Sequence, residues 1–119
     1  MITTTTILNN VVHGVPSGNY DGSSMDWYSP AVEAADYYHG RSSLQTVTID
    51  VTGFVGTIVI EATLDSVAET ATWFTTETYS SVPPLTDRYP FTITGNFTWV
   101  RLHITDFDAG TINFVTIAY

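Results

Sequence analysis

The sequence predicts an all-β protein, and three observations lead to that prediction. Threonine makes up 21 of the 119 residues, other β-branched and aromatic residues are plentiful, and leucine is scarce; this composition favours strands over helices. Apolar and polar residues alternate along several segments, as they do in half-buried strands. Segments rich in Gly, Pro, Asn and Asp separate them. We therefore expect a single antiparallel β-sandwich of about seven to nine short strands, with a jelly-roll-like topology.

The length favours one domain spanning residues 1–119, in which residues 1–39 form a loop-rich N-terminal part or arm. A hydrophobic fraction of 44% is too high for a disordered chain. The sequence has no cysteine, which excludes disulfides, thiolate metal sites and a thiol nucleophile.

The N-terminal part is the least regular. Residues 2–8 are β-branched and predict either a strand or an extended, threonine-rich arm that could add to the sheet edge of a neighbouring protein. Residues 13–30 have the composition of a loop. Residues 31–38 predict either a helical turn or a short strand with Val32 on one face. Large apolar side chains within the loop are expected to hold it against the domain: Met25, Trp27 and Tyr28.

From residue 44 onward the alternation is clear. Three strands are expected, at residues 44–51, 57–64 and 71–79, with a break at 53–56 and a proline-rich connection at 80–90 that is unsuited to a central strand. The side chains expected to point inward are Val47, Ile49, Val51, Ile58, Ile60, Ala62 and Leu64.

The pattern in the last third of the chain predicts a β-meander. A strand at residues 91–94 is followed by a two-residue turn at Gly95 and Asn96, because both residues tolerate positive φ. Residues 97–105 alternate, a turn follows at 106–110, and residues 111–118 close the chain. In that last segment the inward phase slips between Phe114 and Val115, which indicates a bulge or a strand covered on both sides. The side chains expected to point inward from residues 97–105 are Val100, Leu102 and Ile104.

Charge excludes some partners. Twelve acidic residues face three arginines, no lysine is present, and the net charge is −9. Binding to nucleic acid or to an anionic membrane needs a basic patch, which three dispersed arginines cannot make. We therefore expect no nucleic-acid partner and no membrane partner. No apolar run reaches the length of a transmembrane helix, and the N-terminus lacks the features of a signal peptide.

No catalytic or cofactor motif is found, so we expect a protein that is not an enzyme and that needs no cofactor. The histidines His13, His39 and His103 do not have the spacing of metal ligands. A hydrolase with two carboxylates remains a minor alternative, because twelve acids are available and a sandwich can bring two together.

Two pairs of aspartates resemble fragments of calcium loops: Asp21 with Asp26, and Asp106 with Asp108. Neither pair completes the spacing of an EF-hand loop, so these residues are weak metal candidates. The alternative is that the aspartates cap turns.

Outward-facing aromatic residues give the stronger signal. Trp99, Arg101 and His103 share the face of a strand whose other face is apolar. An aromatic residue beside arginine suits a protein interface, or a surface that stacks on a sugar ring. Trp27 is a further contact candidate. The alternative is that the second sheet or a loop covers this face and that Arg101 pairs with an acid such as Glu61.

Two segments, residues 40–78 and 94–119, carry a recognisable pattern. A Leu-x-Thr-Val strand precedes Gly-Phe-Val-Gly-Thr-Ile-x-Ile-x-Ala-x-Leu, and Trp-Phe follows an acidic loop. Gly-Asn-Phe-Thr-Trp-Val-Arg and a later Gly-Thr-Ile complete it. This pattern resembles the small β-sandwich domains of virion structural proteins in tailed bacteriophages, notably contractile-tailed phages of cyanobacteria. The loop at residues 65–72 lacks the proline that many relatives carry there.

The resemblance implies a non-enzymatic structural protein of a virion, made in the host cytoplasm. It would be either a capsid decoration (cement) subunit or a component of the tail, baseplate or fibre. Its partners would be other capsid or tail proteins and copies of itself. The alternative function is a carbohydrate-binding module that recognises host surface glycans.

Overall fold

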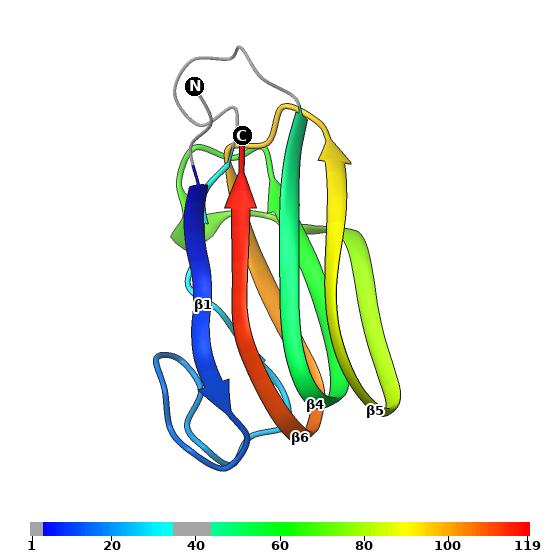
Figure 1. Cartoon of the computed structure of the whole chain (residues 1–119). Helices are drawn as coiled ribbons and strands as arrows, with labels where there is room; N and C mark the ends of the chain where they lie inside the picture. Colours follow the sequence, from blue (N-terminus) through cyan, green and yellow to red (C-terminus); the bar gives the residue numbers. More distant parts are fainter. Residues whose placement is uncertain (1–3, 35–43) are drawn as a thin grey trace.

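The structure is a computed structural model, and it describes residues 4–34 and 44–119. In these residues the expected all-β fold is confirmed: six strands form one antiparallel sheet (Figure 1), with a single 3₁₀ turn, η1 (Ala68–Thr70). The strands are β1 (Thr4–Val12), β2 (Trp27–Tyr28), β3 (Val32–Glu33), β4 (Leu44–Thr63), β5 (Phe74–Thr94) and β6 (Trp99–Ala118).

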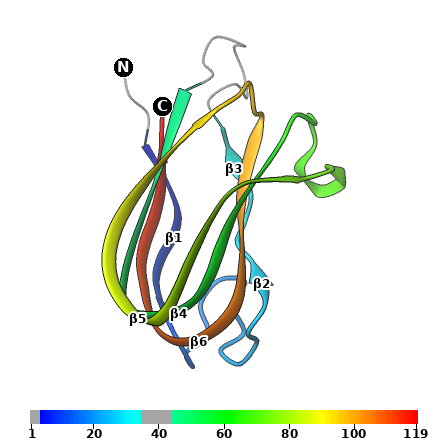
Figure 2. The same cartoon turned by 90° about the vertical axis from the view of Figure 1, so that its right-hand side faces the viewer.

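The three long strands bend midway and fold the sheet into two layers, which Figure 2 shows from the side. Layer one has the order β1, β6 (111–118), β4 (44–52) and β5 (87–94). Layer two has the order β2 with β3, β6 (99–105), β4 (56–63) and β5 (74–81). If β2 and β3 count as one strand, the described residues form eight strand segments in jelly-roll order. The predicted sandwich topology is therefore confirmed.

Glycines allow the bends of β4 and β6. Gly53 has φ 59° and Gly110 has φ 90°, which are values that residues with a Cβ rarely adopt. At Gly110 the backbones of β4 and β6 approach so closely that a Cβ would lie 2.3 Å from the carbonyl oxygen of Gly53. The interruptions expected at residues 53–56 and 106–110 are thus bends inside continuous strands, and the expectation of separate strands there was wrong.

Two expected connections were also wrong. Residues 80–90 continue β5 through its bend, because β5 is an edge strand and an edge strand tolerates proline. Gly95 and Asn96 do not form a hairpin turn, since β4 lies between β5 and β6 in the sheet. The chain instead crosses there from layer one to layer two (Figure 2).

The core lies between the layers. All the side chains expected to point inward from β4 and β6 are buried, except Leu64, which is 60% exposed because β4 ends at Thr63. The aromatic residues Tyr20, Phe54 and Phe107 fill the space near the bends. The expected bulge in β6 is confirmed and lies at Asn113, the residue skipped in the register with β4.

The N-terminal segment forms β1 at the edge of layer one. Thr4 and Thr6 pair with Ala118 and Thr116 of the same chain, so residues 4–12 are not a free arm. Val32 lies in the short strand β3 rather than in a helical turn, while residues 35–38 lie outside the described residues.

Candidate functional site

The strongest candidate site lies on the outer face of layer two. The alternation of β6 places Trp99, Arg101 and His103 on this face, as predicted, while their neighbours Val100 and Leu102 are fully buried. The site is therefore built on a strand fixed by the core.

Arg101 is held on three sides. Its Nε donates a hydrogen bond to Oε1 of Glu61, its cross-strand partner on β4, at 2.7 Å. Its guanidinium carbon lies 4.3 Å from the ring centre of Tyr28 and 4.4 Å from that of Trp73. The pairing with Glu61 is the alternative that the sequence left open, and it is confirmed. Cation–π contacts with two rings and one ion pair fix the plane of the guanidinium.

Tyr28 is fixed in turn by His103. The two rings are stacked with centroids 4.1 Å apart and planes 13° apart. They lie on directly opposed positions of β2 and β6, where cross-strand side chains meet. A row of stacked groups therefore runs from His103 through Tyr28 and Arg101 to Trp73.

Trp99 is oriented by the loop that joins β4 to β5. Its Nε1 donates a hydrogen bond to the backbone oxygen of Ser66 at 3.2 Å. The loop is closed by its own bonds: the Thr63 hydroxyl donates to the Thr72 carbonyl oxygen at 2.8 Å, and the Thr72 N–H donates to Asp65 Oδ2 at 2.7 Å. Figure 2 shows this loop, in green, projecting from layer two.

These groups line an open pocket of about 550 Å³, which we call the aromatic groove. Trp99 and Arg101 come from β6, and Tyr28 is the last residue of β2. Residues 29–31 join β2 to β3, and Trp73 with residues 68–69 comes from the β4–β5 connection. Asn19 also lines it. A second hollow of about 410 Å³ shares Ala31 and Trp99 with the groove and is further lined by Thr5, Val32 and Glu33.

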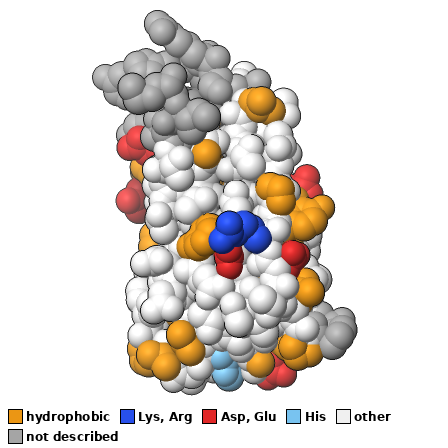
Figure 3. All heavy atoms as spheres, in the orientation of Figure 1, with side chains coloured by type: hydrophobic (Ala, Val, Ile, Leu, Met, Phe, Trp, Pro, Cys, Tyr) orange, Lys and Arg blue, Asp and Glu red, His pale blue; other side chains and the backbone are white. Residues whose placement is uncertain are grey.

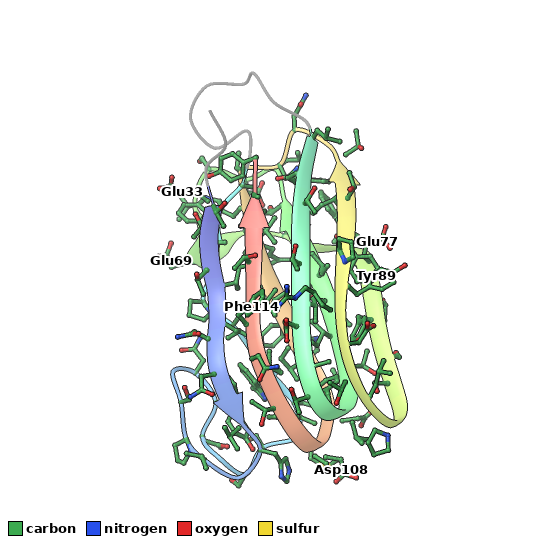
Figure 4. The ribbon with its side chains drawn as sticks, viewed as in Figure 1. Glu33, Glu69, Glu77, Tyr89, Asp108 and Phe114 are labelled. Atoms are coloured by element: carbon green, nitrogen blue, oxygen red, sulfur yellow. The ribbon has the colours of Figure 1, made fainter. Side chains whose placement is uncertain are left out.

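The aromatic groove carries no excess of positive charge. Glu61 is bound to Arg101, Glu69 lines the groove, and Glu33 lines the second hollow. Figure 4 shows Glu33 and Glu69 on the same side of the molecule. The site thus combines aromatic rings, one oriented guanidinium and a weakly acidic surround.

Trp27 does not belong to this site, so its prediction as a contact residue was wrong. It is 6% exposed, and its ring lies 5.2 Å from that of Tyr20 and 6.3 Å from that of Phe107. Its Nε1 has no hydrogen-bond partner among the described residues. Because neighbouring strand residues face opposite sides, Tyr28 takes the outward position instead.

Of the four aspartate candidates, Asp21 caps a turn. Asp21 accepts hydrogen bonds from the backbone N–H groups of Ser23 at 2.9 Å and Ser24 at 2.7 Å, and these bonds lower its pKa to about 2. Asp26 Oδ1 accepts a bond from the Asp106 N–H at 3.2 Å, so these two residues meet. Asp108 is exposed. Within residues 4–34 and 44–119, no three His, Asp or Glu side chains gather as metal ligands would.

His13 does not line the groove. The rings of His13 and Phe107 pack nearly perpendicular to each other, with centroids 5.2 Å apart and planes 88° apart. His39 lies outside the described residues.

The outer face of layer one forms a second surface, which we call the threonine face. It is dominated by short polar side chains and appears mostly white in Figure 3, with one positive–negative pair near its centre. Cross-strand partners on this face form three rows. The outward residues are Thr4, Thr6 and Asn9 on β1; Phe114, Thr116 and Ala118 on β6; Thr46, Thr48 and Asp50 on β4; and Arg88, Pro90 and Thr92 on β5.

The charged pair on the threonine face is self-compensating. Arg88 Nε donates to Asp50 Oδ2 at 2.6 Å, and Asn113 Nδ2 donates to Asp50 Oδ1 at 2.8 Å. The Asn113 bond and the Arg88 contact lower the pKa of Asp50. Arg88 also lies 5.5 Å from the ring of Phe114, which Figure 4 labels on β6. The three rows therefore carry no net charge.

The contacts of Arg101 with Trp73 and Tyr28 were not predicted from the sequence. Trp73 precedes β5 by one residue, at the end of the β4–β5 connection, and its ring lies against the guanidinium of Arg101. Tyr28 was expected only to hold the loop down. A signal for both was present in the excess of aromatic residues beside polar turns, but it did not indicate where the rings would point.

No family model, curated protein or solved structure matches this chain. Among the described residues, no helix is both long and apolar enough to cross a membrane.

Proposed function

We propose that this protein is a non-enzymatic structural subunit of a bacteriophage virion, which assembles with copies of itself and with other capsid or tail proteins. The observation that carries the proposal is the threonine face. On a chain of net charge −9, the charged side chains in its three rows are Arg88 and Asp50, and these two are paired with each other. If two copies met through the threonine face, the residues of its three rows would add no electrostatic repulsion between them.

The fold supports the proposal by analogy. Jelly-roll sandwiches occur in viral capsid proteins and in lectin domains. A fold alone does not assign a function, because one fold hosts many functions. The resemblance of residues 40–78 and 94–119 to phage virion proteins favours the first of these two classes. The decoration and tail placements both remain compatible with the threonine face.

The first test is the mass of the protein in solution, measured by light scattering over a range of concentrations. We expect a trimer or a larger assembly for the natural sequence, and a monomer for Thr48→Glu, which places a charge at the centre of the threonine face. Thr78→Glu is the matched control, because Thr78 is exposed on layer two. Equal masses for both variants would contradict assembly through the threonine face.

The second test is mass spectrometry of purified particles of the virus whose genome encodes this chain. We expect the protein in the particles at many copies. Its absence from them would overturn the structural role, whatever its mass in solution.

A second candidate function is a carbohydrate-binding module for host surface glycans. It is favoured by the aromatic groove, where Trp99, Trp73 and Arg101 converge on one open pocket. Ligand sites commonly combine such rings with a few fixed polar groups. A virion subunit can carry such a groove, so the two functions are compatible.

A further inference from the structure

We infer that the aromatic groove binds an uncharged carbohydrate, with Trp99 as the stacking surface and Arg101 as the fixed hydrogen-bond donor. This inference rests on the second candidate function and specifies its ligand class. It is independent of the assembly proposed for the threonine face, which lies on the other layer.

Trp99 has the properties of a stacking surface. Its indole is neither buried in the core nor fully exposed, and the bond to Ser66 holds it in one orientation. One face of a pyranose ring presents C–H groups, which pack against an aromatic ring, while hydroxyls project from the rim. A ring held before binding loses little conformational entropy when a sugar binds.

Arg101 has the properties of a prearranged donor. Glu61 engages Nε–H, which is one of its five donors, and Tyr28 and Trp73 confine the guanidinium between their rings. The planar fork of donors suits adjacent hydroxyl oxygens on a sugar. Asn19 and Glu69 also line the groove and supply both donors and acceptors.

Charge decides which sugars fit. Glu61 compensates the charge of Arg101, and Glu69 and Glu33 add negative charge nearby. A ligand bearing carboxylate, sulfate or phosphate would be repelled by these groups and by the chain as a whole. The same argument excludes nucleic acid, whose bases could otherwise stack on the rings.

Size is consistent with a small ligand. The volume of about 550 Å³ lies within the range of about 300–1,000 Å³ that is usual for small-molecule sites. The groove is bordered by two separate connections, one before β3 and one before β5, so variation in either would change which sugar fits.

The experiment is a binding screen of the full chain by saturation-transfer NMR and tryptophan fluorescence. The uncharged probes are glucose, galactose, mannose, rhamnose, N-acetylglucosamine and their di- and trisaccharides. The acidic probes are N-acetylneuraminic acid, glucuronic acid and a sulfated galactose. A proline-rich peptide is included because aromatic grooves also bind such peptides.

We expect at least one uncharged probe to bind, with Kd on the order of 1 mM or tighter, and no acidic probe to bind comparably. Trp99→Ala should weaken binding by about tenfold or more. Arg101→Gln should weaken it by a similar factor. The matched controls are Phe114→Ala and Arg88→Gln, which remove an aromatic residue and an arginine from the threonine face and should leave binding unchanged.

The other outcomes of the screen would contradict the inference. Binding of acidic probes alone would overturn the inference but leave the carbohydrate-binding candidate standing. Binding of the peptide and of no sugar, or of no probe at all, would overturn both. Trp99→Phe is a second variant in case Trp99→Ala does not fold, because it keeps a ring but loses the bond to Ser66. Equal binding by the natural chain, Trp99→Phe and a folded Trp99→Ala would also overturn the inference. The solution mass of the same samples tests the assembly role separately.

Discussion

Each layer carries one arginine–carboxylate pair, and the two pairs differ in what surrounds them. The Arg88 side chain is 70% exposed, whereas that of Arg101 is 25% exposed and lies between two rings. An exposed ion pair contributes little to stability because water and salt screen it. The pair on layer two is therefore the one whose orientation can serve a ligand.

Tyr79 is a buried residue whose pKa departs from its ordinary value. Burial, and then the nearby charge of Asp87, to which its hydroxyl donates a hydrogen bond at 3.3 Å, raise the pKa of Tyr79 to about 12. The unfolded chain has a tyrosine pKa of about 10. The neutral ring therefore stabilises the folded state fully below pH 10, and this contribution is lost as the pH rises toward 12.

We expect the free energy of unfolding of the natural chain to fall between pH 10 and pH 12 more steeply than that of Tyr79→Phe, by a total of about 2 to 3 kcal/mol. Urea unfolding at pH 9, 10.5 and 11.5 measures the difference. The other tyrosines are the same in both chains, so their contribution to the pH dependence of the unfolding free energy cancels in the comparison. Parallel pH profiles for the two would contradict the assignment.

At the level of elements, the fold depends on strands that change layers without ending. The bends of β4 and β6 contain glycines, and Gly110 is the position with the closest backbone approach. Alternation then resumes beyond each bend with the inward side again toward the core. The layers are joined by continuous backbone at this end of the sandwich.

Gly110→Ala should therefore destabilise the protein by about 2 to 5 kcal/mol, from positive φ and from overlap with the backbone at Gly53. Gly53→Ala is the matched control. It also has positive φ, but nothing lies within 4 Å of its added Cβ, so we expect a cost of about 1 to 2 kcal/mol. Urea unfolding of both variants measures the costs. A cost for Gly110→Ala no greater than that for Gly53→Ala would show that the close approach does not limit the bend.

At the level of the whole molecule, charge is the dominant property. The net charge is −9, and ion pairs involve only Arg88 and Arg101 among the described residues. Self-repulsion of this size opposes the compact state, and salt screens it.

Raising the salt concentration from about 10 mM to about 300 mM NaCl should raise the thermal midpoint by about 3 to 5 °C, if screening recovers about 1 kcal/mol. Tetramethylammonium chloride at the same ionic strength should act equally, because screening does not depend on a bound cation. Differential scanning calorimetry measures both. A midpoint that falls with salt would contradict net self-repulsion, and a rise seen only with NaCl would indicate a specific cation site.

The sequence by itself determined the all-β class, the sandwich, the inward side of the central strands and the bulge in β6. These features are local: period-two alternation places Val47, Ile49 and Val51 on one face whatever the strands pair with. The outward set Trp99, Arg101 and His103 followed from the same periodicity. The Arg101–Glu61 pair was an alternative that alternation alone could suggest.

Only the tertiary structure decided where the strands bend, how they are ordered, and what meets Arg101. A glycine pair such as Gly53 and Gly56 has the same local chemistry in a hairpin turn as in a bend, and the choice depends on strands distant in sequence. Trp27 and Tyr28 are adjacent aromatic residues, and the pairing of β2 with β6 decided which of them entered the core. Trp73 lines the groove at the end of the β4–β5 connection, and alternation does not specify the path of a connection. Long-range pairing sets all of these outcomes, and alternation along one segment carries no information about it.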